Sequence, residues 1–578
     1  MIKTLAGSIR EYKKSSLLSP LFVTFEVILE VFIPLVMAKL IDYGIEAGNS
    51  AVTLKIGAGL LALSILSMLF GSLSGLFAAD ASAGFAKNLR HDMFYNVQNF
   101  AFSNIDKFST ASIVTRLTTD VTNVQNAYMM IIRIAVRSPI MMVCALVMAF
   151  SINAKIASIF FAAIPILGVG LYLIMKRAHP LFRKMFYAYD DMNNVVQENL
   201  HGVRVVKAYV REEHEDEKFN FVAAKIYKIA VKAEKLLMLN SPLMQFVVYG
   251  CMLGVAWFGA RTIVLTGGTA LTTGELTSLF SYIMQVLISL MMLSMIFVMI
   301  IMSRASAERI VEIINEKSDL ADAANPITEI KDGSVDFENV WFSYKKDSER
   351  SVLKNINLHI NTGETIGIIG GTGSAKSSFV QLLPRIYDPT SGVVKVGGVD
   401  VRDYDLTALR NNVAFVLQKN VLFSGSIKEN LRWGDENATD EELIHACKLA
   451  QADDFIREFP DGYDTHIEQG GTNVSGGQKQ RLCIARALLK KPKILVLDDS
   501  TSAVDTRTDA LINAAFKTEI PDTTKFIIAQ RISSVQNADR IIVMDNGQIN
   551  GIGTHEELLA NNEIYREVYQ SQQKGDDK

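Results

Sequence analysis

The 578-residue sequence is poor in cysteine and carries no large excess of charge. Its formal net charge of -3 provides no general basic surface, so nucleic acid is not an expected partner. The cysteines form no CxxC pair and have no histidine at metal-ligand spacing, so buried, reduced thiols are expected rather than a disulfide or a metal site. They are Cys144, Cys251, Cys447 and Cys483.

The N-terminal segment lacks the features of a cleavable signal. Residues 1–14 contain no short apolar core followed by small residues at a cleavage site, so the first apolar stretch is expected to be retained. No extra domain precedes that stretch, and a built-in leader peptidase is therefore not expected.

Long apolar stretches dominate the first half of a chain that is 49% hydrophobic and 21% charged overall. A helix of about 20 apolar residues crosses a hydrocarbon layer ~30 Å thick. Six stretches reach this length and predict a multi-pass protein of the cell membrane. They cover 17–41, 55–79, 128–151, 156–175, 243–265 and 277–302.

Lysine and arginine are unevenly distributed around these spans. They are frequent in the N-terminal stub and in 176–240, whereas the short loops at 42–52 and 152–155 hold only Lys155. Because basic loops stay on the cytoplasmic side, both termini and the second half of the chain are predicted to be cytoplasmic.

Segments 80–127 and 176–242 are polar and favour helix, which predicts that the spans continue as helices beyond the bilayer. Charged bends interrupt them at 106–120 and 207–219. Bends at the tips of long helical hairpins suit docking onto another domain, and a solvated turn is the alternative.

Charged residues also occur in the apolar stretches. Glu26 and Glu30 lie one helical turn apart, as do Arg133 and Arg137. They predict a polar cavity lining, an ion pair between helices, or a position at the watery rim. Methionines crowd the last two spans and predict either a permissive pocket or ordinary contacts with lipid and core.

The second half has the alternating strands and helices of an α/β nucleotide-binding domain. The predicted fold is therefore multi-domain: an all-α transmembrane domain of six helices over 1–310, a polar linker over 311–334, and an α/β P-loop domain over 335–578.

A glycine-rich loop, "GGTGSAKSS", follows the apolar strand at 365–369. Its backbone N–H groups and the following helix N-terminus favour phosphates; Lys376 would reach the β and γ phosphates and Ser377 the Mg²⁺ ion. Ala375 replaces the usual glycine, which is tolerable if its φ is negative. The loop comprises Gly370, Gly371, Thr372, Gly373, Ser374, Ala375, Lys376, Ser377 and Ser378.

Two further motifs accompany the loop. The strand at 493–498 delivers Asp498 to the sheet edge, where its carboxylate can hold magnesium. In "VSGGQ", a second glycine-headed helix implies a second phosphate contact. Since one nucleotide is not easily clasped by both sites within one domain, the pairing is expected between two domains. The motif comprises Ser475, Gly476, Gly477 and Gln478.

With these motifs the chain resembles an ATP-binding cassette (ABC) exporter half-transporter, from about residue 17 to residue 570. The resemblance implies two cassettes stacked head to tail, with ATP between the loop of one and the "VSGGQ" signature of the other. It implies that Tyr344 stacks on adenine, that Gln418 senses magnesium and the transmembrane domain, and that Asp505 lies at the dimer interface. The bends near 106–112 and 207–215 correspond to coupling helices, of which the second reaches the partner's cassette.

Two positions depart from the family pattern. The family's general base is a glutamate, and Asp499 is one methylene shorter, so its carboxylate is expected to be set back from the attacking water. The family's switch histidine is replaced by Gln530, which carries no positive charge. With the signature intact, the chain resembles the degenerate-site subunit of heterodimeric bacterial multidrug-type exporters.

The expected cofactors are ATP and Mg²⁺. The expected partners are a second ABC half-transporter, membrane lipid, and a transported small molecule or peptide; drugs, lipids and peptides all pass through bundles of this architecture. The alternatives are a homodimeric exporter with two slow sites and an ATP-gated regulator or channel.

Overall fold

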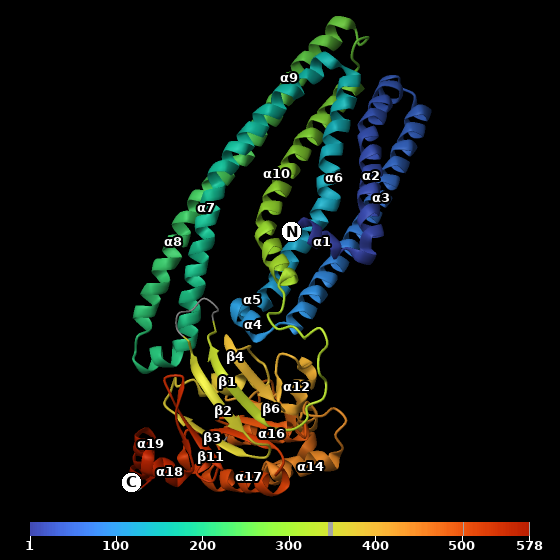
Figure 1. The fold of residues 1–578 in the computed structure, drawn as a ribbon. Coiled ribbons are helices and arrows are strands. Elements are labelled where there is room, and N and C mark those ends of the chain that lie inside the picture. Colours follow the sequence, from blue (N-terminus) through green and yellow to red (C-terminus); the bar gives the residue numbers. More distant parts are fainter. Residues whose placement is uncertain (345–350, 501, 577–578) are drawn as a thin grey trace. The chain divides into compact units, whose positions relative to one another are not determined.

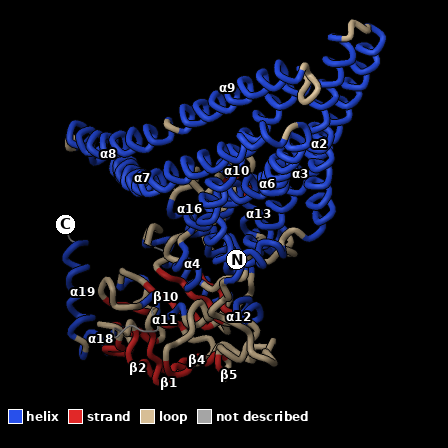
Figure 2. Tube along the Cα trace, turned by 90° about the horizontal axis from the view of Figure 1, so that it is seen from above, coloured by secondary structure: helices blue, strands red, loops and turns tan. Residues whose placement is uncertain are grey.

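The computed structural model describes residues 1–344, 351–500 and 502–576, which separate into two compact units. The helical unit contains Met1–Gln98 and Thr110–Glu316, and the sheet unit contains Asn99–Ser109 and Lys317–Lys578. Figure 1 and Figure 2 show the first as helical throughout, whereas the strands gather in the second. This is the predicted fold class, a helical transmembrane part followed by a sheet-containing nucleotide-binding part.

Six helical segments of the described chain are long and apolar enough to cross a membrane, which confirms the predicted number of spans. Their lengths of 37 to 55 residues exceed the ~20 that a bilayer requires, as the polar extensions predicted. The helices are α1 (Ile2–Gly7), α2 (Lys13–Leu40), α3 (Ser50–Gln98), α5 (Thr110–Thr115), α6 (Val121–Ile152), α7 (Ala154–Ala208), α8 (Glu212–Met238), α9 (Asn240–Thr266) and α10 (Thr273–Asn315), with short turns η1 (Arg10–Tyr12), η2 (Ile41–Glu46) and η3 (Arg116–Asp120).

Helices α2 and α6 are joined by an ion pair. The guanidinium of Arg137 on α6 binds the carboxylates of Glu26 and Glu30 on α2, the latter at 2.6 Å. For Glu26, Glu30 and Arg137 the ion pair between helices is therefore confirmed, whereas Arg133 donates to the carbonyl of Gly71 at 3.5 Å. A charge within a span is costly unless it is paired, and this pairing explains how the sequence tolerates both glutamates.

The methionines of the last two spans divide between core and surface. Met244 and Met252 pack against the core that α2, α6, α7, α9 and α10 share. Met238 and Met295 are exposed by 68% and 56%. This distribution favours ordinary contacts with core and lipid. The described cysteines are all free, as expected, and Cys251, Cys447 and Cys483 are buried.

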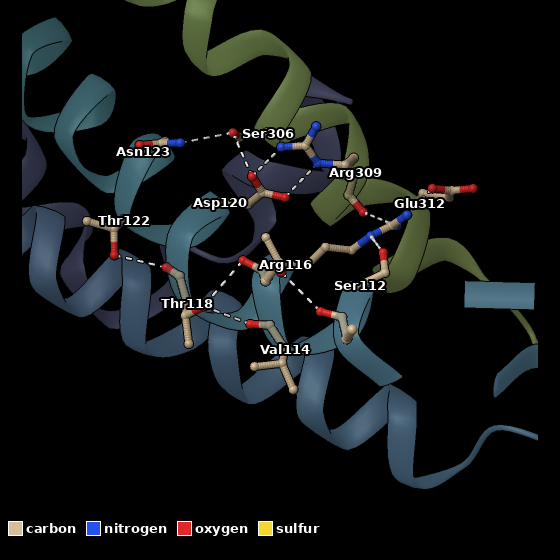
Figure 3. Close-up of polar contacts among 12 residues, drawn as sticks. Ser112, Val114, Arg116, Thr118, Asp120, Thr122, Asn123, Ser306, Arg309 and Glu312 are labelled. Atoms are coloured by element: carbon tan, nitrogen blue, oxygen red, sulfur yellow. Dashed lines mark hydrogen bonds and ion pairs between the residues drawn. The ribbon is translucent and has the colours of Figure 1, made fainter. Parts of the chain in front are cut away.

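A buried carboxylate ties the lower ends of α6 and α10 together (Figure 3). Asp120 is 1% exposed and accepts hydrogen bonds from Arg309 Nε at 2.7 Å and from Ser306 Oγ at 2.8 Å. Arg116, one turn away on η3, donates to the carbonyl of Arg309 at 2.8 Å and to Glu312 at 2.8 Å. The π-helical η3 places both side chains on the face that meets α10.

The first bend between the long helices begins earlier than the sequence predicted. Helix α3 ends at Gln98, the short helix α4 (Phe102–Phe108) follows, and the chain is helical again from Thr110. The predicted bend at 106–120 is therefore too late, because Thr110–Asp120 is polar but helical. Helix α4 belongs to the sheet unit, where Tyr387 donates a 2.9 Å hydrogen bond to Asp106.

The main sheet of the sheet unit has six strands in the order β12-β11-β3-β10-β9-β6. Strands β11, β3, β10, β9 and β6 run parallel, and β12 is antiparallel to β11. Side chains alternate along β9, so that Leu495 and Leu497 enter one hydrophobic core while Ile494 and Val496 enter the other. Burial on both faces explains why the parallel strands read as continuous apolar runs.

A second, antiparallel sheet has the order β2-β1-β4-β5, and β7 pairs with β8. The strands are β1 (Val335–Phe342), β2 (Leu353–Ile360), β3 (Thr365–Gly370), β4 (Ser391–Val396), β5 (Val399–Asp400), β6 (Val413–Val416), β7 (Gly425–Ser426), β8 (His466–Ile467), β9 (Ile494–Asp498), β10 (Thr524–Ile528), β11 (Arg540–Asp545) and β12 (Gln548–Gly553). The helices are α11 (Lys376–Gln381), α12 (Leu406–Asn412), α13 (Ile427–Leu431), α14 (Asp440–Leu449), α15 (Asp453–Glu458), α16 (Gly476–Leu489), α17 (Thr506–Glu519), α18 (His555–Asn561) and α19 (Glu563–Asp576).

Candidate functional site

The carboxyl ends of four neighbouring parallel strands meet at one edge of the main sheet. Strand β3 leads into the glycine-rich loop, β9 ends at Asp498, and β6 and β10 are followed by Gln418 and Gln530. Ligands of open α/β sheets bind at such an edge. A cleft of about 580 Å³ lies here, lined by all nine loop residues together with Gln418, Asp498, Asp499 and Gln530, and by Val352 and Ile528, which the sequence did not suggest.

Lys376 lies across the mouth of the loop. Its Nζ donates to the carbonyls of Gly370 and Gly371, each at 2.9 Å. Burial lowers the pKa of Lys376, and the carboxylates of Asp498 and Asp499 oppose that shift. A positive charge next to the exposed backbone of the loop is suited to a polyphosphate.

Ala375 has φ 73° and is the N-cap of α11, in the left-handed region. The sequence-based expectation that its methyl group is tolerable rested on a negative φ, and that premise is wrong. Glycine adopts this conformation freely, whereas an alanine there is strained. The loop therefore has the backbone conformation of a glycine-containing loop, and the backbone of Ala375 is strained.

Asp498 is 4% exposed at the end of β9. Burial raises the pKa of its carboxyl group, the neighbouring Asp499 adds to the rise, and a hydrogen bond from Ser377 opposes it. A buried carboxylate beside a second one favours a cation. Mg²⁺ takes one or two carboxylates and completes its shell with phosphates and water, so these carboxylates suit that ion.

Asp499 makes the contacts that distinguish this site. One oxygen of its carboxylate, Oδ2, accepts a hydrogen bond from Gln530 Nε2 at 2.7 Å and a longer one from Gln418 Nε2 at 3.4 Å. The side chain is largely buried, with 8% exposure. The two residues that depart from the family pattern are thus bonded to each other, a pairing that the motif positions did not reveal.

Tyr344 lies beside the loop and does not line the cleft. Its hydroxyl is 2.8 Å from Ser378 Oγ, and its ring meets that of Tyr387 edge-on at 5.2 Å. Tyr344 is half exposed. Tyr387, which also binds Asp106 of α4, was missed from the sequence because no motif contains it.

The signature residues lie outside the cleft, at a separate site on the sheet unit. Ser475 caps α16 by accepting from Gln478 N at 3.3 Å, and the Gln478 side chain accepts from Ser475 N at 2.9 Å. A Cβ on Gly477 would lie 2.8 Å from the carbonyl of Ala503, so this glycine permits close contact with the loop that leads to Asp505. Ser475, Gly476 and Asp505 are exposed, and none of them lines the cleft.

Comparison with known proteins agrees with this geometry. Residues 16–291 match the ABC transporter transmembrane region, and residues 353–502 match the ABC transporter family. The chain is 36% identical over 547 residues to the uncharacterised ABC transporter ATP-binding protein YfiB of Bacillus subtilis strain 168, covering 95% of this chain and 94% of that protein. This chain belongs to the ABC transporters. Its transmembrane region and single nucleotide-binding domain make it an ABC exporter half-transporter with an ATPase domain that drives transport.

Two further relatives bear on this ABC exporter. The ATP-dependent lipid A-core flippase of Desulfotalea psychrophila is 32% identical over 488 residues, covering 84% of each chain. The structure of a bacterial Atm1-family ABC exporter with ATP bound superimposes with a TM-score of 0.82 at 26% identity, covering 98% of each chain. The half-transporter architecture predicted from the motifs is therefore confirmed.

Proposed function

We propose that this ABC exporter chain is the degenerate-site subunit of a heterodimer. Its own ATP site would be slow or silent, and its signature would complete the active site of a different partner chain. The observation that carries the proposal is the 2.7 Å hydrogen bond between Gln530 and Asp499, the residue at the position of the family's general base.

A general base must offer an acceptor within hydrogen-bond reach of the attacking water. Oδ2 of Asp499 is engaged by two amide groups, and its side chain is one methylene shorter than glutamate. Neither Gln530 nor Gln418 carries charge, so neither can balance charge on the γ-phosphate or relay a proton as an imidazole does. Loss of general-base help costs about 10²- to 10⁴-fold in rate, and this supports slow hydrolysis in the cleft.

Nucleotide binding is expected to survive in the same cleft. The loop at 370–378 would hold the phosphates and Tyr344 the adenine, with Lys376 neutralising charge on the β and γ phosphates. Ser377, Gln418 and Asp498 would hold Mg²⁺, which would screen the phosphate charge. ATP bound without rapid turnover would keep this half of the dimer closed on its partner.

The signature would act on nucleotide held by the partner. Ser475 and Gly476 are exposed at the N-terminus of α16, where backbone N–H groups and the helix dipole favour phosphate. Gly477 packs on Ala503, just before the proposed dimer-interface residue Asp505. This arrangement supports one surface that presents both residues to a second cassette.

Contacts at the cytoplasmic bends support coupling between ATP and transport. The first bend includes α4, which is bonded to Tyr387. At the second bend Tyr209 and Val210 are exposed by 74% and 81%, and an acidic run follows at 212–217. We propose that this tip docks on the partner's cassette. This chain has a groove of about 330 Å³ that would suit such a tip on a partner. Phe423 and Trp433 line it, together with the basic residues Lys419, Arg486 and Lys490.

The exported substrate is proposed to be a drug, lipid or peptide that enters from the lipid or the cytoplasm. Lysine and arginine are frequent in the N-terminal stub and in 176–240 but nearly absent from the short loops at 42–52 and 152–155, and this asymmetry supports cytoplasmic termini and a cytoplasmic cassette. The flippase relative is named for lipid A-core, and this supports a lipid-like substrate as one member of that class.

Restoring the family residues tests the degenerate site. The double variant D499E/Q530H in the purified dimer is expected to raise the ATPase rate at this chain's site by about 10²-fold, since both a reaching carboxylate and an imidazole return. Single variants D499E and Q530H serve as matched controls and should give much smaller gains. Phosphate release from trapped single-turnover complexes measures the effect.

The chain purified alone provides the opposing result. If it releases phosphate briskly, and D499A abolishes that release, then Asp499 is a competent base and the site is not degenerate. A homodimer with two slow sites would instead show weak phosphate release that the double variant accelerates at both sites.

A further inference from the structure

The C-terminal helix α19 holds the backbone on both sides of the switch position. Gln572 Nε2 donates to the carbonyl of Gln530 at 2.7 Å, and Gln572 Oε1 accepts from the N–H of Ile532 at 2.9 Å. One carboxamide thus uses its donor and its acceptor on residues two apart, as a neighbouring β-strand would. These bonds fix the peptide groups that flank Arg531.

The same segment carries the side chain that reaches the cleft. Gln530 and Arg531 are exposed, whereas Ile532 is 1% exposed and packs in the core. The Gln530 carboxamide extends from this backbone to Asp499 at 2.7 Å. Gln530 therefore links α19 to the nucleotide cleft, since its carbonyl is bonded to Gln572 and its side chain to the carboxylate of Asp499.

Helix α19 is itself anchored firmly enough to act as a support. Tyr565 is fully buried in the core that also contains Ile532, and its hydroxyl is 2.7 Å from His555 Nδ1. The N–H of Tyr565 donates to Asn562 at 2.9 Å. Gln572 lies about two turns further along this anchored helix, which limits the positions that its side chain can reach.

We propose that Gln572 is a positioning residue for the switch position. It sets where the Gln530 side chain lies in the cleft, and by that route it sets how long Mg-ATP stays bound. The inference rests on the proposed role of Gln530 beside the nucleotide, and it adds a residue outside every motif of the cassette. Gln572 touches the backbone of the switch segment and acts through Gln530.

The two hydrogen bonds from Gln572 to the backbone of Gln530 and Ile532 are called the Gln572 clamp below. Hydrogen exchange of the full-length protein without nucleotide tests this clamp directly. In Q572A the segment 529–535 should exchange roughly tenfold faster, because two hydrogen bonds to its backbone are lost. Q572E keeps the acceptor for Ile532 N–H and loses the donor to Gln530, so an intermediate rate is expected. Q573A, on the next residue, removes a bond to Tyr569 and should leave the rate unchanged.

The exchange of the segment around Tyr565 distinguishes positioning from loss of the whole helix. It should stay at the wild-type rate in Q572A. If 529–535 exchanges at the wild-type rate in Q572A, or if Q573A has the same effect, the clamp does not exist. If both segments lose protection together, α19 has undocked and a specific role for Gln572 is wrong.

Dissociation of Mg-ATP tests the role in the cleft. Q572A and Q530A should each speed dissociation from this chain's site, by about threefold or more if one hydrogen bond of ~0.7 kcal/mol is affected. The double variant Q572A/Q530A should dissociate no faster than Q530A, since Gln572 acts through Gln530. Additive effects would overturn the proposal. If Q530A leaves the rate of Mg-ATP dissociation unchanged, the proposed role of Gln530 is wrong. The hydrogen-exchange result then still shows whether Gln572 holds the backbone of the switch segment.

Discussion

Ala375 lies at a backbone conformation that suits glycine, and this strain sits inside the nucleotide loop. A left-handed conformation costs an L-residue about 1 to 2 kcal/mol. We expect A375G to raise the free energy of unfolding of the nucleotide-binding domain by up to ~1 kcal/mol, because glycine's larger entropy in the unfolded chain offsets part of the gain. Thermal unfolding and Mg-ATP affinity of the purified protein measure the effect.

A matched change at the same position works in the opposite direction. A375V places a β-branched side chain at positive φ, so it should lower stability and weaken Mg-ATP binding. Equal stability of the alanine, glycine and valine proteins would show that the loop relaxes away from φ 73° in solution.

At the scale of single residues, the sequence predicted which side chains surround the cleft. Lys376 and Gln418 follow parallel strands and Asp498 ends one, and such strands bring their carboxyl ends to one edge. Contacts between side chains were not predictable in the same way. The Gln530 to Asp499 bond joins two strand ends 31 positions apart, and the Gln572 clamp lies outside any motif.

At the scale of helices, Asp120 is expected to hold the lower ends of α6 and α10 together. D120N keeps the shape but removes the charge that Arg309 binds. The expected loss of stability is about 1 to 3 kcal/mol, since an uncharged amide replaces the buried carboxylate while Arg309 keeps its positive charge. Thermal unfolding, together with substrate transported per ATP hydrolysed, measures it.

An exposed ion pair on α10 provides the control. Arg304 binds Glu308 at 2.8 Å with 71% and 54% of the two side chains exposed. Such pairs contribute little, so R304Q should change stability by less than ~0.5 kcal/mol and leave the transport ratio unchanged. If D120N is as mild as R304Q, the network of Figure 3 does not link the two helices.

The elements themselves were largely readable because hydropathy and helix length are local properties. The spans follow directly from apolar runs, and the parallel strands from short, fully buried runs such as 494–498. The first bend was predicted too late in the chain because Thr110–Asp120 looks like a loop by composition. That segment is helical and contacts α10, for example through the bond from Arg116 to Glu312. A local sequence pattern does not contain such contacts.

At the scale of the whole molecule, the proposed division of labour predicts unequal defects in the assembled dimer. K376A should weaken nucleotide occupancy in this chain's cleft and slow the cycle only partly. G477A should abolish most hydrolysis at the partner's site, because its Cβ would meet the Ala503 carbonyl at 2.8 Å and displace the signature. ATPase rates of the two purified variant dimers test this, and equal severity would contradict it.

The nucleotide-binding half is assembled from two separate pieces of polypeptide, because α4 belongs to the sheet unit. Asp106 and its partner Tyr387 are 281 positions apart. On the ribosome, α4 is therefore made long before the surface that receives it exists. The sheet unit reaches its final form only after most of the chain has been translated, and a gene fragment that starts at residue 317 encodes a body from which this early-made piece is missing.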